Sequence, residues 1–280
     1  MEVFYNELSN RPIATNSEEA KGRIIALLET MRSLREYDIN IMRAHNNFYA
    51  EQLSDEYCFS SFFGDQTVST NLKTLLQTIV RTPFIEDVDS NEAESFISNT
   101  FSTQNHLDET VNPEGLASAW VFSLPVISIG SHAFWRSNSL LLAISNNIKQ
   151  EVRCEDIPNL FSKDCINSEA FRQWIDYLNP SIPLNSEENI YKVFPNSQYQ
   201  FDSQAIADIL SWFYDDKRYL AKVRELLEDI PNNPFTGGKG KTETLTGGNG
   251  KASKRIAKKD RIVYTYTKDK ITIHQCREHY

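Results

Sequence analysis

The sequence predicts an α+β protein in two parts. A larger domain of mixed helices and strands is followed by a small domain in which a helical hairpin packs on an antiparallel sheet. The 280 residues, 40% of them hydrophobic and 24% charged, have an ordinary globular composition and suffice for two domains. Residues 180–189 contain two prolines and few apolar side chains, which is typical of a linker. We therefore expect domains at 1–185, with a further boundary near residue 110, and at 197–280.

In the first domain, the periodicity of apolar residues and helix-capping residues predict helices that alternate with strands. Asn16 and Glu19 form a capping box, and the apolar side chains that follow recur at helical spacing. Beyond residue 115, Val, Ile, Leu and aromatic residues dominate, and Pro125 and Gly130 interrupt them, which favours short strands. The predicted helices are 17–36, 69–80, 90–101 and 168–178, and the predicted strands are 117–123, 126–129, 139–144 and 151–157.

In the second domain, residues 201–230 predict two helices with a bend at 215–218, because apolar side chains recur at helical spacing on both sides of "DDKR". Such a pair needs a sheet to pack on. We expect that sheet from "KASKRIA", "RIVYTYT" and "ITIHQC". The glycine-rich segment before it is not a phosphate-binding P-loop, because Phe235 stands where that motif requires its first glycine.

Charge is distributed unevenly along the chain. Residues 197–280 carry 15 Lys and Arg against 11 Asp and Glu, a net charge of +4, and the remaining residues hold 14 against 27, a net charge of −13. The last 50 residues alone carry +7. The C-terminal part is therefore suited either to binding a polyanion or to forming a solvated basic face, and the rest is not suited to a polyanion.

Other features predict a cytoplasmic protein. The four cysteines, at 58, 154, 165 and 276, are widely spaced, which predicts free thiols and no zinc site or disulfide framework. No apolar run is long enough to span a membrane, and the first 20 residues lack the pattern of a signal peptide. We expect no metal, no cofactor and no membrane partner.

The C-terminal part resembles a RelE-type toxin of the YoeB branch. The resemblance rests on "SWFYDDKRYLAKVRELLEDIPNNPFTG", "GKTETL", "SKRIAKKDRIVYTYTKD" and the terminal "CREHY". It implies a RelE-like (microbial-ribonuclease-like) domain that cuts messenger RNA, usually on the ribosome. It also implies mRNA and the ribosome as partners, with a separate antitoxin, and no DNA.

Cleavage of RNA without a metal needs a base for the 2′-OH, a cation for the phosphate oxygens and an acid for the departing 5′ oxygen. By resemblance, Glu243 is the base, Arg261 the cation and His279 the acid, while Tyr280 orients or stacks on the substrate. Arginine suits the second role, because its planar fork matches a phosphate. The further residues expected to bind RNA are Arg255, Lys254 and Lys241.

The sequence departs from the family in the loop between Phe235 and Glu243, which is one residue longer than usual, and at Thr246 and Ala252. A two-residue turn at 268–269 would pair Arg261 with Cys276. Among the histidines outside the motif, we expect His274 to be packed or at the surface. We assign no chemistry to the others, at positions 45, 106 and 132.

Two functions remain open at this stage. The first is an mRNA endonuclease (mRNA interferase) fused to a sensing or regulatory domain, in a toxin–antitoxin or anti-phage and stress setting. The second is a catalytically weak RelE-like fold that binds RNA or protein. The acidic domain would either inhibit the basic one in cis or serve to solubilise or recruit it.

Inhibition in cis predicts that residues 197–280 cleave RNA faster than the full chain at equal concentration. The difference should narrow as added salt screens the attraction between the acidic and basic parts. Cleavage rates measured across a salt series test this, and equal rates at low salt would leave recruitment as the better account.

Overall fold

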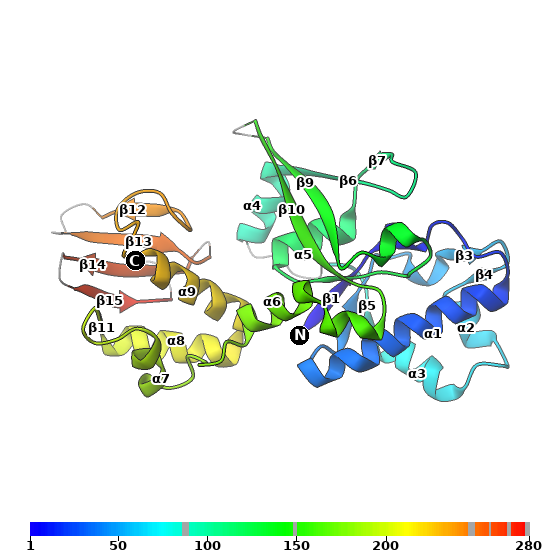
Figure 1. The fold of residues 1–280 in the computed structure, drawn as a ribbon, viewed down its shortest axis with the longest axis horizontal. Helices are drawn as coiled ribbons and strands as arrows, with labels where there is room; N and C mark the ends of the chain where they lie inside the picture. Colours follow the sequence, from blue (N-terminus) through cyan, green and yellow to red (C-terminus); the bar gives the residue numbers. More distant parts are fainter. Residues whose placement is uncertain (86–89, 148–149, 246–249, 258, 268–269, 278–280) are drawn as a thin grey trace. The chain divides into compact units, whose positions relative to one another are not determined.

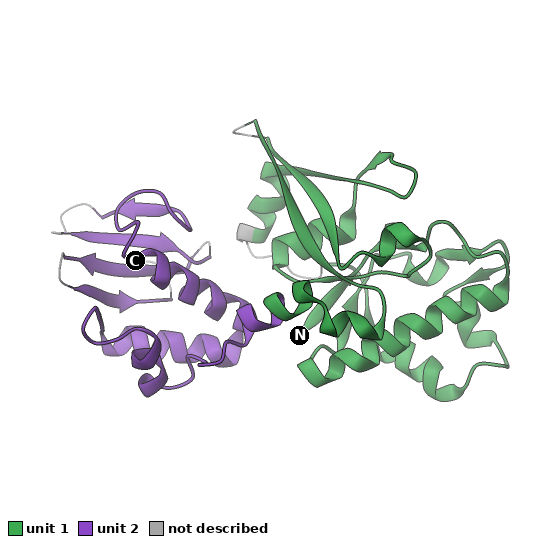
Figure 2. Ribbon diagram, viewed as in Figure 1, with its two compact units in different colours: residues 1–173 green, residues 174–280 purple. Residues whose placement is uncertain are grey.

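The computed structural model describes residues 1–85, 90–147, 150–245, 250–257, 259–267 and 270–277. The chain divides into two compact units, Met1–Gln173 and Trp174–Tyr280 (Figure 2). Both units contain helices and sheets, which confirms the α+β prediction. The division falls before residues 180–189, where we placed the linker, and the domain limits 1–185 and 197–280 stay a prediction.

The first unit is built on an eight-stranded sheet in the order β5-β2-β1-β8-β10-β9-β6-β7 (Figure 1). The first five strands of this order are parallel, and the last three continue it antiparallel. The strands are β1 (Glu2–Tyr5), β2 (Ile41–Arg43), β5 (Val80–Arg81), β6 (Asn99–Gln104), β7 (Thr110–Val111), β8 (Val126–Ile127), β9 (Ser139–Asn146) and β10 (Glu151–Leu160), with a separate pair β3 (Gln52–Ser54) and β4 (Tyr57–Cys58).

The helices of this part largely follow the sequence pattern. Asn16 accepts a hydrogen bond from the backbone N–H of Glu19, as the capping box predicts. The segment predicted as a helix over 90–101 leaves the helix after Ser98 and continues as β6. The α-helices are α1 (Ser17–Ser33), α2 (Ser61–Gly64), α3 (Thr70–Ile79), α4 (Ser90–Ser98), α5 (Glu114–Phe122) and α6 (Glu169–Leu178). None of the described helices has the length and apolar character needed to cross a membrane.

The strand predicted over 117–123 is wrong, because this segment lies in helix α5. An apolar run is compatible with a buried strand or a buried helix, and periodicity alone does not distinguish them. Here α5 lies against β1, β8 and β10. Gly115 permits the close approach, because a Cβ at this position would lie 2.2 Å from the carbonyl oxygen of Tyr5.

The second unit has the predicted helical hairpin on an antiparallel sheet (Figure 1). Asp216 separates the two long helices and caps the second by accepting the backbone N–H of Arg218. The strand order is β11-β15-β14-β13-β12, in which only β11 and β15 are parallel. The elements are α7 (Glu187–Val193), β11 (Tyr199–Phe201), α8 (Ser203–Asp215), α9 (Lys217–Asp229), β12 (Thr242–Thr244), β13 (Lys251–Arg255), β14 (Arg261–Tyr266) and β15 (Ile271–Gln275).

The two faces of β13 have different environments. Ala252 belongs to the hydrophobic core with Ile262 and Tyr264, whereas Ser253 is paired with Glu243 and Val263 on neighbouring strands. Side chains alternate between the faces of a strand. Lys254 therefore shares the face of Ala252, and its side chain is fully buried.

The buried ammonium of Lys254 is satisfied by groups from α9 and the glycine-rich loop. Its Nζ lies 2.8 Å from Oδ2 of Asp229 and donates to the Thr242 hydroxyl at 2.9 Å and the Lys239 carbonyl at 3.2 Å. Burial alone would raise the pKa of Asp229, but hydrogen bonds from Lys254 and Asn233 hold it below its ordinary value. The ion pair thus joins α9, the loop and β13.

The glycine-rich loop packs closely against the carboxylate of Asp229. The backbone N–H of Lys239 donates to Oδ2 of Asp229 at 2.9 Å. Gly238 has a φ of +70°, and a Cβ there would lie 2.3 Å from the same oxygen. A side chain at Gly238 would be strained and would clash, so the glycine is required by the fold of the loop.

Lys254→Met is expected to destabilise the C-terminal unit by about 3 kcal/mol, because it leaves the Asp229 carboxylate without its buried cation. The exposed Lys259→Met is the matched control and should change stability by less than about 0.5 kcal/mol. Hydrogen exchange of peptides from residues 217–277 measures the two effects. Equal protection in both variants would show that the ion pair does not hold the loop.

Candidate active site

The face of the second sheet that bears Ser253 carries the main candidate residues. Glu243 on β12 is opposite Ser253 on β13, and Arg255 on β13 is opposite Arg261 on β14. Directly opposite residues project from the same face of a sheet. The sheet therefore brings Glu243, Arg255 and Arg261 to one surface, as the sequence motif requires.

Glu243 and Arg261 form an ion pair on this surface. Nη2 of Arg261 lies 3.1 Å from Oε2 of Glu243, and Nη1 is 3.4 Å from the hydroxyl of Ser253. The Arg261 side chain is only 7% exposed, whereas that of Glu243 is 38% exposed. The arginine is therefore held in place by the sheet, and the carboxylate faces solvent.

A second cation completes the surroundings of Glu243. Nζ of Lys241 lies 3.0 Å from Oε1 of the carboxylate, and the Lys241 side chain is 63% exposed. The hydrogen bond from Lys241, together with the charge of Arg261, lowers the pKa of Glu243 below its ordinary value. The carboxylate is thus ionised at neutral pH and held between a fixed cation and an exposed one.

Three further residues, predicted to bind RNA, differ in their environments: Lys241, Arg255 and Lys254. Lys241 is exposed beside Glu243, and Arg255 is half-buried on the same face as Arg261. Lys254 faces the core instead, where its ammonium is enclosed. The structure therefore corrects the prediction for Lys254, because the strand alternation turns it away from this surface.

The end of β15 is fastened to helix α8. The backbone N–H of Cys276 donates to Oδ2 of Asp208 at 2.8 Å, and the Trp212 indole N–H donates to the Cys276 carbonyl at 3.0 Å. The guanidinium of Arg277 lies over the Trp212 ring, 4.3 Å from its centroid, and donates to Asp215. The predicted acid His279 and its neighbour Tyr280 lie outside the described residues.

The hairpin of β14 and β15 follows the predicted register only in part. Tyr264 pairs with Ile273 and Tyr266 with Ile271, as a turn at 268–269 requires, although those two turn residues lie outside the described ones. A register shift after Val263 pairs that residue with Gln275. The shift moves the partner of Arg261 away from Cys276, so the predicted pairing is wrong. No sequence signal marked this irregularity.

His274 links two elements at the surface, as expected. Its Nδ1 lies 2.8 Å from Oδ2 of Asp202, and its Nε2 lies 2.8 Å from the hydroxyl of Thr265. The ring thus connects the start of α8 with β14 and β15, and this arrangement is structural.

The sequence interpretation missed Asp208 and Trp212 as anchors for the chain beyond β15. Both lie on the buried side of α8, with Ala205 and Ile209. A carboxylate within an apolar helical stripe is an available signal, because a buried carboxylate requires a hydrogen-bonding partner. The backbone N–H of Cys276 provides it.

Residues 201–280 match the family model described as a YoeB-like toxin of bacterial type II toxin-antitoxin systems. Over 74 residues the chain is 43% identical to the toxin YoeB of Escherichia coli (strain K12), which covers 26% of this chain and 87% of that protein. Over 81 residues it is 37% identical to the toxin YoeB of Streptomyces coelicolor, covering 29% of this chain and 95% of that one.

Among solved structures, the chain is similar to a YoeB dimer from Staphylococcus aureus, with 36% identity and a TM-score of 0.28. A heterotetrameric YoeB-YefM toxin-antitoxin complex from the same organism gives the same identity and TM-score. Each match covers 30% of this chain and 97% of the other.

Proposed function

Because the chain belongs, through residues 201–280, to the YoeB family of toxins from toxin–antitoxin systems, we propose that it is an endoribonuclease that cleaves mRNA on the ribosome. The observation that carries this proposal is the ion pair of Glu243 and Arg261 on the face of the sheet that bears Ser253. It combines a carboxylate that is ionised at neutral pH with a guanidinium whose position is fixed. These are the groups that a metal-independent attack of the 2′-OH requires.

In the proposed mechanism, the phosphate of the RNA takes the place of Glu243 as the partner of Arg261. The guanidinium then neutralises the charge that grows on the phosphate oxygens. The released Glu243 accepts the proton of the 2′-OH, and the oxygen attacks the adjacent phosphorus. His279 protonates the departing 5′ oxygen, and Tyr280 orients the substrate. The products are a 2′,3′-cyclic phosphate and a 5′-OH.

Substrate binding also raises the basicity of Glu243. In the free protein two cations lower its pKa, which makes it a weak base. When the phosphate pairs with Arg261 in place of Glu243 and the exposed Lys241 turns to the phosphate, this stabilisation of the carboxylate is lost, and its pKa rises. The base is thus strengthened only when substrate is present. Half-buried Arg255, paired with Arg261 across the strands, provides a further contact to the phosphate backbone.

For regulation, we propose a separately encoded antitoxin. The YoeB of the Staphylococcus aureus complex is bound to YefM, and a separately encoded antitoxin would bind this chain in its second unit. The acidic first unit offers inhibition in cis as the alternative, on the grounds of its charge.

A second function, RNA or protein binding with weak catalysis, is favoured by one observation. The two cations that neutralise Glu243 in the free protein reduce its strength as a base. The two functions differ in whether Glu243 affects cleavage or only binding.

Glu243→Gln is expected to reduce single-turnover cleavage by about 10²–10⁴-fold, the usual contribution of a general base. RNA binding should stay equal or tighten, because a negative charge beside Arg261 is removed. Since the pKa of Glu243 is lowered in the free protein, kcat/KM should show no acid limb from this residue near neutral pH, whereas the single-turnover rate of bound RNA should lose activity at a higher pH than kcat/KM does. Rates and dissociation constants for the same ribosome-bound mRNA measure both effects.

Glu228→Gln provides the matched control, because Glu228 pairs with Arg224 on the exposed side of α9. It should change neither the single-turnover cleavage rate nor the dissociation constant for RNA. Cleavage by Glu243→Gln at the wild-type rate would favour the binding function.

Full-length protein should leave RNA with 2′,3′-cyclic phosphate and 5′-OH ends, because the nucleophile is the 2′-OH. His279→Gln should lose most of the single-turnover rate without changing the ends that form. End-specific ligation and mass spectrometry of the fragments identify the chemistry. Recovery of 5′-phosphate ends would exclude the proposed route.

A further inference from the structure

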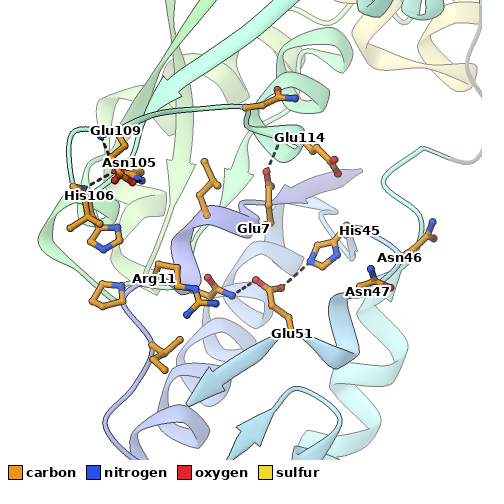
Figure 3. Close-up of a pocket in the computed structure, with 16 residues that line it drawn as sticks. Glu7, Arg11, His45, Asn46, Asn47, Glu51, Asn105, His106, Glu109 and Glu114 are labelled. Atoms are coloured by element: carbon orange, nitrogen blue, oxygen red, sulfur yellow. Dashed lines mark hydrogen bonds and ion pairs between the residues drawn. The ribbon is translucent and has the colours of Figure 1, made fainter. Parts of the chain in front are cut away.

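The first unit contains a polar pocket of about 1010 Å³ that the function of the second unit does not explain (Figure 3). Glu7 and Arg11 reach it from the segment after β1, and His45 reaches it from the segment after β2. The sheet places β2 on one side of β1 and β8 on the other, with all three strands parallel. In open sheets of this type, ligands bind beyond the carboxyl ends of the strands where the order reverses.

Glu7 is a buried carboxylate fixed at this point. Its Oε1 accepts the backbone N–H of Glu114 at 2.7 Å, and its Oε2 accepts that of Gly115 at 2.9 Å. Burial raises the pKa of Glu7 to about 7, although these hydrogen bonds act in the opposite direction. A carboxyl with such a pKa is common at ligand-binding and active sites.

A second carboxylate lines the same pocket. Oε2 of Glu51 lies 3.0 Å from Nε2 of His45, and Oε1 accepts a hydrogen bond from the side-chain amide of Asn10. Burial raises the pKa of Glu51, whereas the contact with His45 lowers it. Figure 3 shows Glu7, Glu51 and His45 around the pocket. The sequence analysis gave no role to His45 or to His106, which also lines it.

The wall of the pocket is rich in carboxylates. Four glutamates line it against one arginine and two histidines, and five asparagines add both donors and acceptors. An anionic ligand would meet repulsion from the carboxylates. The wall therefore selects a neutral or cationic ligand that donates several hydrogen bonds.

A smaller, apolar pocket of about 480 Å³ adjoins this one and shares His45 and Glu114 with it. Its walls include three aromatic rings, those of Phe84, Phe96 and Phe101. A flat ring packs well against such walls. The two pockets together accept a molecule with a donor-rich end and a flat end.

We propose that this double pocket binds a nucleoside, with the ribose hydroxyls donating to Glu7 and Glu51 and the base lying among the phenylalanines. Carboxylates accept hydrogen bonds from ribose hydroxyls beyond the carboxyl ends of strands in other parallel sheets. The absence of a phosphate in a nucleoside matches the excess of carboxylates in the wall. The first unit is then a sensor of a small metabolite.

Isothermal titration of the full chain with adenosine, guanosine, cytidine and uridine tests the proposal, with each 5′-monophosphate as a second probe. At least one nucleoside should bind, and more tightly than its own monophosphate. Glu51→Gln should weaken that binding at least tenfold. Glu114 lines the pocket at an exposed position. The variant Glu114→Gln should therefore weaken binding without unfolding the chain. The exposed Glu29→Gln on α1, outside the pocket, is the control for charge.

Three results would overturn the proposal: no binding of any nucleoside at 5 mM, tighter binding of the monophosphates, or binding that both pocket variants leave unchanged. The last would place the nucleoside elsewhere, for example on the RNA-binding face of the second unit. Circular dichroism of each variant verifies that a loss of binding is not a loss of fold.

Discussion

The position of the Glu243 strand in the C-terminal unit depends on the buried pair of Lys254 and Asp229. A lysine on the core side of β13 would be costly without a partner, and Asp229 at the end of α9 supplies it. The same carboxylate binds the backbone of the glycine-rich loop at Lys239. The loop leads directly into β12, so the pair determines where that strand joins the sheet. The position of Glu243 follows from this.

In the same unit, a carboxylate of a second helix also accepts a backbone N–H group. Asp208, on the buried side of α8, accepts the backbone N–H of Cys276, and Trp212 binds the carbonyl of the same residue. Helix α8 therefore directs the chain that continues to the terminal His-Tyr. Two carboxylates within helices thus bind the backbone of the glycine-rich loop and of the residue that follows β15.

In the first unit, a carboxylate again meets backbone N–H groups, here at the start of α5. Glu7 is held there because Gly115 lets the helix approach the backbone of β1. Buried Asn6, Ser128 and Asn159 form a hydrogen-bonded chain across the neighbouring strands β1, β8 and β10. These hydrogen bonds join the carboxyl-end regions of the three strands near the segment that carries Glu7.

The sequence by itself determined the helical hairpin, the sheet that follows it and the toxin family, because these depend on local periodicity and on a motif with fixed spacing. The roles of Glu243, Arg261 and Arg255 stay a prediction of that motif. Only the tertiary structure decided the rest. An apolar run such as 117–123 is equally suited to a strand or a helix, and its packing against β1 selected the helix. Lys254 and Arg255 are adjacent cations in sequence, yet strand alternation sends one to the core and leaves the other on the open face. The pocket around Glu7, His45 and Glu51 joins segments that no local pattern connects, because parallel strands bring together residues that are far apart in the chain.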